Sequence, residues 1–181
     1  MRKLILSLLV LAIFGSYLAA AADIPRNSDG YHYIINRRSG MLLSVIDGPD
    51  KGKSNTDNLD VIVQKRAYGE KYQQWDLRYF TEKGQKFYVF IARHSGKVLD
   101  VPELSKDNRK QLIQYDYNGG QNQHFKLVCT EGEWYRIIAR HSNKYLEVLD
   151  KSLKEGAPIV QNARKTMDYQ HQEWAFVKVD C

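Results

Sequence analysis

The sequence predicts an all-β protein built from three repeats of four short strands, arranged with pseudo-threefold symmetry. A ten-residue segment that starts at Ala92 recurs, in altered form, from Ala139 and, earlier in the chain, from Asn36. Copies spaced by roughly fifty residues indicate a repeat architecture. Short apolar runs alternate with polar residues at a period of two, which is typical of strands and not of amphipathic helices.

Each repeat is expected to contain its strands in the same order. β-branched and aromatic residues fill these strands, and Gly, Asn, Asp and Ser separate them. The first strands are predicted at 33–35, 87–91 and 134–138, followed by a turn and a Leu-x-Val strand. The third strands are predicted at 61–64, 112–114 and 159–161, and the fourth at 73–77, 123–127 and 172–176.

The three repeats are expected to share one core, because a four-stranded unit of this size cannot bury its own apolar face. Residues at matching positions predict the layers of that core. These layers are Ile35, Ile91 and Ile138; Leu43, Leu99 and Leu146; and Trp75, Phe125 and Trp174.

The first 22 residues have the pattern of a secretory signal peptide, with Arg2 and Lys3 before a short apolar run and small residues at 20–22. An uncleaved anchor is the alternative, and no later stretch is long and apolar enough for a membrane span. Residues 23–30 are predicted to lead into one domain at 31–181. Its repeats lie at about 31–80, 87–130 and 134–181, and the predicted location is secreted and extracellular.

Charge and cysteine content narrow the classes of function. Of the 27 Lys and Arg residues two lie in the leader, and against 21 Asp and Glu the rest leave a net charge of +4. This charge is spread along the chain, whereas a nucleic-acid binder more often has a concentrated basic stripe. Cys129 and Cys181 can form one disulfide in an oxidising compartment or stay unpaired. No cofactor is expected, and no Cys/His spacing indicates a metal site.

A Gln-x-aromatic motif recurs once in each repeat, after the same two strands: Gln73 to Trp75, Gln123 to Phe125 and Gln172 to Trp174. In a chain with a secretory leader this pattern resembles the ricin-type β-trefoil lectin family. The resemblance runs from Tyr31 to about Val179 and is strongest in the middle repeat, at 95–101 and 113–125. It implies a β-trefoil fold and non-catalytic glycan binding, although function depends on the site and not on the fold.

The middle repeat contains the side chains that a sugar site needs. Carboxylates and amides bind the hydroxyls of a sugar, and a flat aromatic ring stacks on its apolar face. Asp100 follows a core leucine, so strand alternation turns its side chain away from the core. The resemblance implies sugar contacts at Asp100, Tyr115, Asn118, Asn122 and Gln123, with Gln123 also able to hold Asp100 in place. As the alternative, Asp100 is a surface carboxylate paired with a lysine, Lys97 or Lys110.

The other repeats match less well. The first has Ser44 in place of the aspartate, with Lys65, Arg66 and Tyr72 nearby, so no sugar site is expected there. Its loop at 47–57 is predicted to be solvated. The third repeat offers a possible second site without an aromatic aligned to Tyr115, formed by Glu147, Asn162, His171 and Gln172.

An enzyme is not predicted. His94 and His141 each stand beside a serine in a hairpin turn, where they are expected to be solvated, and adjacency in sequence is not a catalytic triad. Two alternatives to a lectin stay open. One is a protein-binding β-trefoil, a secreted inhibitor or ligand with a degenerate sugar site. The other is salt-sensitive binding of sulfated glycans through Lys106, Arg109, Lys110, Lys151 and Lys154. Self-association could add avidity to weak sites.

Overall fold

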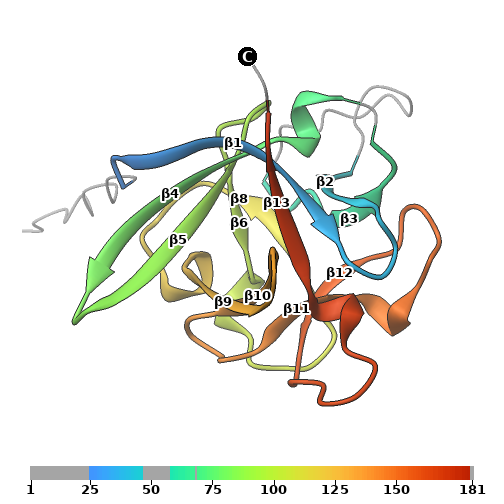
Figure 1. The fold of residues 1–181 in the computed structure, drawn as a ribbon. Coiled ribbons are helices and arrows are strands. Elements are labelled where there is room, and N and C mark those ends of the chain that lie inside the picture. Colours follow the sequence, from blue (N-terminus) through green and yellow to red (C-terminus); the bar gives the residue numbers. More distant parts are fainter. Residues whose placement is uncertain (1–24, 47–57, 68, 180–181) are drawn as a thin grey trace, which may run out of the picture.

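The computed structural model describes residues 25–46, 58–67 and 69–179. They form thirteen strands with short 3-10 turns between them (Figure 1). The predicted signal peptide, the loop at 47–57 and Cys181 lie outside the described residues, and so does the possible disulfide with Cys129. Within the described part, no helix is long and apolar enough to cross a membrane.

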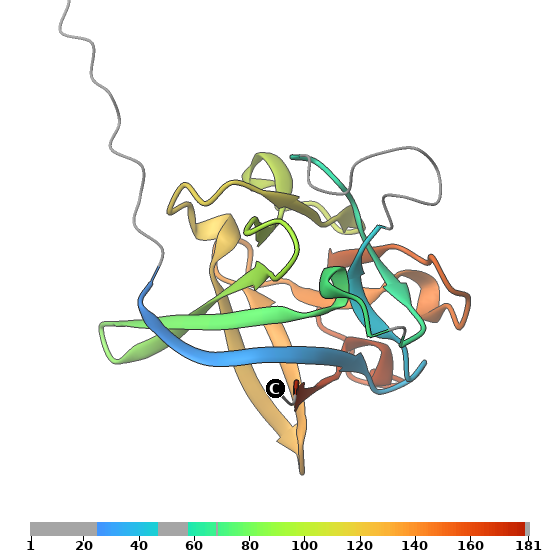
Figure 2. The ribbon, with the colours of Figure 1, turned by 90° about the horizontal axis from the view of Figure 1, so that it is seen from above.

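Six strands close into a barrel. They are the first and last strands of each repeat: β1 (Asn27–Asn36), β4 (Trp75–Glu82), β5 (Gln85–Ala92), β9 (Phe125–Glu131), β10 (Trp134–Ala139) and β13 (Trp174–Lys178). Each strand pairs antiparallel with the next, and β13 pairs with both β10 and β1. The ring therefore has no open edge. Figure 2 shows the β4–β5 hairpin (green) and the β9–β10 hairpin (orange) extending from the barrel.

Three hairpins cover one end of the barrel, one from each repeat. Their strands are β2 (Leu42–Val45) with β3 (Ile62–Lys65), β6 (Val98–Asp100) with β8 (Ile113–Tyr115), and β11 (Tyr145–Val148) with β12 (Ile159–Asn162). A thirteenth strand, β7 (Lys110–Gln111), pairs with β12, and single bridges join the hairpins at Val61–Ile113 and Val63–Pro158. A closed barrel with a threefold cap confirms the predicted β-trefoil.

The core lies where the barrel meets the cap, and two of its predicted layers are confirmed. The tryptophan and phenylalanine layer and the leucine layer are both fully buried. The two indoles also tie the barrel to the cap within their own repeats, because Trp75 Nε1 donates to the Leu43 carbonyl at 2.9 Å and Trp174 Nε1 to the Leu146 carbonyl at 3.2 Å.

The third predicted layer was wrong by one residue. The first strands face the main core with Ile34, Phe90 and Ile137, all fully buried. Ile35 is half-buried, and Ile91 and Ile138 lie outside the main cluster. Successive side chains of a strand point to opposite faces, so a shift of one residue exchanges the core face for the outer face.

The glutamine of each Gln-x-aromatic motif was predicted to begin the fourth strand. It lies instead in a 3-10 turn that precedes this strand. These turns are η2 (Lys71–Gln73), η4 (Gln121–Gln123) and η6 (Gln170–Gln172), and each strand starts two residues after the glutamine. The buried Nε2 groups of the three glutamines donate to the carbonyls of Arg66, Asp116 and Ala163, at 2.6, 2.9 and 2.9 Å. The motif thus fastens a loop to the barrel in every repeat.

The hairpin serines are structural. Ser39, Ser95 and Ser142 each donate to the Oε1 atom of a buried glutamine, at 2.7, 2.8 and 2.7 Å. The neighbouring histidines are half-buried, contrary to the solvated position predicted. His141 Nε2 lies 2.7 Å from the Ser105 carbonyl oxygen, and burial lowers the pKa of this imidazole.

Candidate functional site

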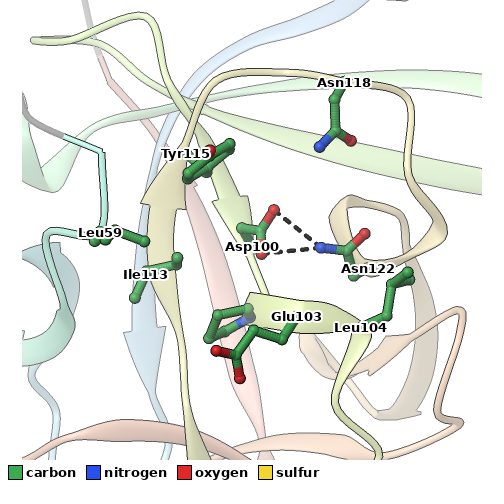
Figure 3. A pocket seen from close by; sticks show the side chains of 9 residues that line it. Leu59, Asp100, Glu103, Leu104, Ile113, Tyr115, Asn118 and Asn122 are labelled. Carbon is green, nitrogen blue, oxygen red and sulfur yellow. Dashed lines mark hydrogen bonds between the residues drawn. The ribbon is translucent and has the colours of Figure 1, made fainter.

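A pocket of about 360 Å³ opens on the cap of the middle repeat (Figure 3). Four of the five predicted contact residues lie on its wall. The wall consists of Leu59, Asp100, Pro102, Glu103, Leu104, Ile113, Tyr115, Asn118 and Asn122. The fifth predicted residue, Gln123, lies behind Asp100.

The β6–β8 hairpin and turn η4 position the polar residues. Asp100 is the last residue of β6 and pairs with Ile113 of β8, and Tyr115 ends β8. Asn122 belongs to η4, where the chain turns back to the barrel. Two hydrogen bonds of 3.1 Å fasten η4 to the end of β6. The Val101 amide donates to the Asn122 carbonyl, and Asn122 Nδ2 donates to the Val101 carbonyl.

The Asp100 carboxylate is held by side-chain amides. Asn122 Nδ2 donates to both oxygens at 3.0 Å, and Gln123 Nε2 donates to Oδ2 at 2.8 Å. Burial raises the pKa of Asp100, and the two amides oppose that rise. A carboxylate offers about four acceptor positions, so these bonds leave capacity for a ligand. The lysine pairing offered as an alternative does not occur, because Lys97 pairs with Asp116 and Lys110 with Glu103.

Gln123 is a positioning residue and not a contact residue. Its side chain is fully buried and does not reach the pocket wall, which corrects its predicted role in contact. Besides Asp100, its Nε2 donates to the Asp116 carbonyl, and its Oε1 accepts the Asn118 amide at 2.9 Å. Gln123 therefore fixes both the carboxylate and the loop that carries Asn118.

Gly120 was missed by sequence reasoning. Asn118 Oδ1 accepts the Gly120 amide at 2.8 Å, which closes a tight turn below the pocket. A Cβ atom at Gly120 would collide with Asn122 Oδ1 and lie 2.9 Å from Asn118 Oδ1. Only glycine therefore fits without moving the two asparagines of the site.

Apolar side chains complete the wall. The Tyr115 ring is 36% exposed and stands beside Asp100, where it offers a flat face to the pocket (Figure 3). Leu59 and Leu104 are 63% and 55% exposed, and both have left-handed backbones, with φ of 74° and 53°. A non-glycine residue in this region costs about 1–2 kcal/mol, and such strain is concentrated at functional sites.

The two leucines differ in how their conformation arises. In the third repeat Lys151, at the position of Leu104, also has a positive φ of 56°, so this turn belongs to the fold and only the leucine is particular to the middle repeat. Leu59 comes from the first repeat, and its amide donates to the Gln114 carbonyl at 3.0 Å. A comparison of repeats with one another could not have placed Leu59 in this pocket.

The third repeat brings its four predicted residues together, but they contact one another. Glu147 Oε1 accepts Asn162 Nδ2 at 2.8 Å, and its Oε2 accepts Gln172 Nε2 at 2.6 Å and lies 3.4 Å from His171 Nε2. Each is at least nine-tenths buried. Burial raises the pKa of Glu147, but the hydrogen bonds from His171, Asn162 and Gln172 outweigh it and the net shift is downward.

The first repeat has no carboxylate at this position. Ser44 is fully buried, donates to the Leu42 carbonyl at 3.2 Å and accepts Gln73 Nε2 at 3.3 Å. The three repeats thus share the positioning glutamine and differ in what it holds. It holds a hydroxyl in the first repeat, an aspartate at an open pocket in the second, and an enclosed glutamate in the third.

The sequence matches the ricin-type beta-trefoil lectin domain-like family over residues 22–108 and 71–162. No curated protein matches the chain. A similar solved structure is the designed 3-fold symmetric protein ThreeFoil, with 34% identity and a TM-score of 0.73 over 83% of this chain and 100% of that chain. Another is the exo-beta-1,3-galactanase 1,3Gal43A from Clostridium thermocellum, with 33% identity and a TM-score of 0.73 over 83% of this chain and 30% of that chain. A third is the Macrolepiota procera ricin B-like lectin in complex with lactose, with 17% identity and a TM-score of 0.67 over 86% of this chain and 100% of that chain. This chain thus spans about a third of the galactanase chain.

The family match covers most of the chain and agrees with the closed barrel, the threefold cap and the repeated glutamine. The protein therefore belongs to the ricin-type beta-trefoil lectin domain-like family.

Proposed function

We propose that this protein is a secreted lectin that binds glycans without catalysis, mainly through the pocket of the middle repeat. The observation that carries the proposal is the Asp100 carboxylate, held by Asn122 and Gln123 beside the exposed Tyr115 ring. Secretion rests on the sequence pattern of the first 22 residues.

The pocket chemistry suits a pyranose. An ionised Asp100 has about one acceptor position left, on Oδ1, where it accepts a hydrogen bond from a sugar hydroxyl. Charge-assisted bonds of this kind are the strong ones. Asn118 and Asn122 can both donate and accept. The Tyr115 ring stacks on the apolar C–H face of the sugar and costs little conformational entropy to hold.

Affinity per site is expected to be weak. The pocket is open and wet, and little net free energy is left after the ligand and the side chains are ordered. Useful binding then requires clustered glycans or self-association of the protein. Galactosides are the first probes to use, because a relative with 33% identity is an exo-beta-1,3-galactanase.

The proposal is tested by titrating a β-galactoside and by a glycan array, with wild-type protein and Asp100→Asn. We expect the substitution to reduce binding on the order of tenfold or more, with an unchanged circular dichroism spectrum. Glu147→Gln is the matched control, because it neutralises the carboxylate at the same position of the third repeat and should keep the array signal. An unaltered signal in Asp100→Asn would locate binding elsewhere and favour the protein-binding alternative.

A further inference from the structure

A second pocket, of about 460 Å³, lies on the barrel side of the third repeat. We call it the Arg136 pocket. Its wall includes Thr130, Glu131, Arg136, Tyr145, Arg164 and Tyr169. None of these residues belongs to the pocket of the middle repeat or to the Glu147 cluster.

The matching place in the middle repeat is an apolar cluster. There, Val89, Ile91 and Val98 form a small second cluster, against which Phe80 and Tyr117 pack. The corresponding positions one repeat further along the chain are Arg136, Ile138, Tyr145, Thr130 and Arg164, and all five line the Arg136 pocket. The same position of the scaffold is thus a filled apolar cluster in one repeat and an open, polar pocket in the next.

Arg136 is unusual because its charge is buried without an anionic partner. The residue is 7% exposed, and its guanidinium lies 4.8 Å from the centre of the Tyr169 ring and 5.6 Å from that of Tyr145. Its Nη2 makes one long hydrogen bond, 3.4 Å to the Lys165 carbonyl, and its Nε has no partner. Within the described chain, no carboxylate lies within 4.0 Å of this guanidinium. Burying an uncompensated charge is costly.

The two glutamates of the wall both pair with an arginine that lies outside it, although Glu173 Oε1 has no hydrogen-bond partner. Glu131 and Glu173 both bind Arg37, at 3.1 and 2.8 Å. Arg136 stays as a buried guanidinium, and Arg164 is exposed at the rim. The wall itself has two arginines and two glutamates. Arg37, from outside the wall, pairs with both glutamates, so the five groups together carry one net positive charge, which favours an anion.

We propose that the Arg136 pocket binds the anionic group, a carboxylate or a sulfate, of an acidic glycan. Both groups present oxygen pairs that match the planar fork of a guanidinium. Tyr145 and Tyr169 hold the fork between their rings, and Arg164 adds a second charge at the mouth. The choice of a glycan as the carrier rests on the proposed function, whereas the need for an anion rests on Arg136 alone.

The test is a calorimetric titration of the full chain at low salt with three probes: methyl β-D-glucuronide, methyl β-D-glucoside 6-sulfate and neutral methyl β-D-glucoside. We expect one acidic probe to bind on the order of tenfold more tightly than the neutral probe, and added salt to weaken it. The acidic probe that binds identifies the anionic group. Equal binding of all three probes, or of none, would overturn the proposal.

Arg136→Val supplies the matched variant, because valine occupies the corresponding position in the middle repeat. We expect it to abolish the preference for the acidic probe and to raise the melting temperature, because an unpaired buried charge is removed. A merely structural Arg136 would instead lose stability. Arg78→Val removes the same charge from a strand position outside the pocket, and it should leave the preference unchanged.

Asp100→Asn separates this proposal from the one for the middle repeat. It should abolish galactoside binding and leave the response to the acidic probe intact. If Asp100→Asn abolished both, the acidic probe would be binding in the middle pocket, and the Arg136 site would be refuted. If wild-type protein bound the galactoside but not the acidic probe, the Arg136 site would be refuted and the proposal for the middle repeat would still stand.

Discussion

The Nδ2 atom of Asn122 lies 3.0 Å from each carboxylate oxygen of Asp100. This contact joins the end of β6 to turn η4, so the backbone of the turn fixes the position of the charged group of the pocket. In the third repeat the matching residue is His171, which lies against Glu147 in an enclosed cluster. The same two positions are therefore used for an open pocket in one repeat and for internal packing in the other.

Galactoside binding should weaken as the pH falls, because the ligand hydroxyls need an ionised Asp100. Burial raises the pKa of this carboxyl, so binding should be lost at a pH above the ordinary aspartate pKa of about 3.9. Titrations between about pH 7 and pH 4 measure it. Affinity that stays constant throughout this range would contradict the assignment.

Protonation of Asp100 does not itself destabilise the fold. A raised carboxyl pKa means that the folded state holds the proton more tightly than the unfolded state does. Ionised Asp100 thus costs stability at neutral pH, and that cost disappears as the pH falls. Burial lowers the pKa of His124 to about 4, so acid does cost stability through this histidine. Tryptophan fluorescence in the same buffers separates the two effects, and binding should begin to weaken at a pH where the protein is still folded.

Gly120→Ala should weaken galactoside binding with little change in melting temperature. Its φ of −65° suits alanine, so the backbone can accept the substitution. The added methyl group, however, collides with Asn122 Oδ1 and crowds Asn118. We expect a loss on the order of tenfold, since the two amides must move. Unchanged affinity in the titration would show that neither asparagine contacts the sugar.

Leu59→Gly should reduce affinity without reducing stability. Glycine adopts the left-handed backbone without the strain of about 1–2 kcal/mol that leucine has there. This gain offsets the cost of about 0.5–1 kcal/mol that glycine adds, because its more flexible backbone loses more entropy on folding. The substitution also removes an exposed apolar wall of the pocket. Chemical denaturation and the galactoside titration check the two effects separately. A destabilised variant with normal affinity would make Leu59 a structural residue.

Glu147→Gln should destabilise the protein and leave galactoside binding intact. Glutamine has one accepting oxygen in place of two, so either Asn162 or Gln172 loses its acceptor, and one unmatched buried polar group costs about 1–3 kcal/mol. The pKa of Glu147 is lowered in the folded state, so its stabilisation is present above the ordinary value of 4.5 and lost as the pH falls through the folded pKa. The difference in unfolding free energy between wild type and variant should therefore shrink in acid.

Much of the fold could be predicted because the three repeats have similar residues at matching positions. The leucine and tryptophan layers are examples, since each core position is confirmed by two others. The first strands were harder. Ile34 and Ile35, like Ile137 and Ile138, are neighbouring apolar residues, and alternation alone cannot tell which of the two faces the core.

The site was predicted in part for a similar reason. Asp100 lies within the ten-residue segment that the repeats share, and Tyr115 directly follows the shared third strand, so their departure from symmetry is visible in the sequence. Leu59 reaches the pocket from another repeat, and the tight packing at Gly120 depends on side-chain positions. Contacts of these kinds arise only in three dimensions. The differing Arg136 and Val89 could have been noticed by the same comparison of repeats.

The most direct measurement is a β-galactoside titration followed by the side-chain amide resonances of the isotopically labelled protein. Asn122 and Gln123 donate to Asp100, whereas Asn162 and Gln172 donate to Glu147. A sugar that binds Asp100 should shift the resonances of the first pair in proportion to occupancy and leave the second pair in place. Shifts at Asn162 and Gln172 alone, or at neither pair while the sugar binds, would contradict the assignment of the middle repeat.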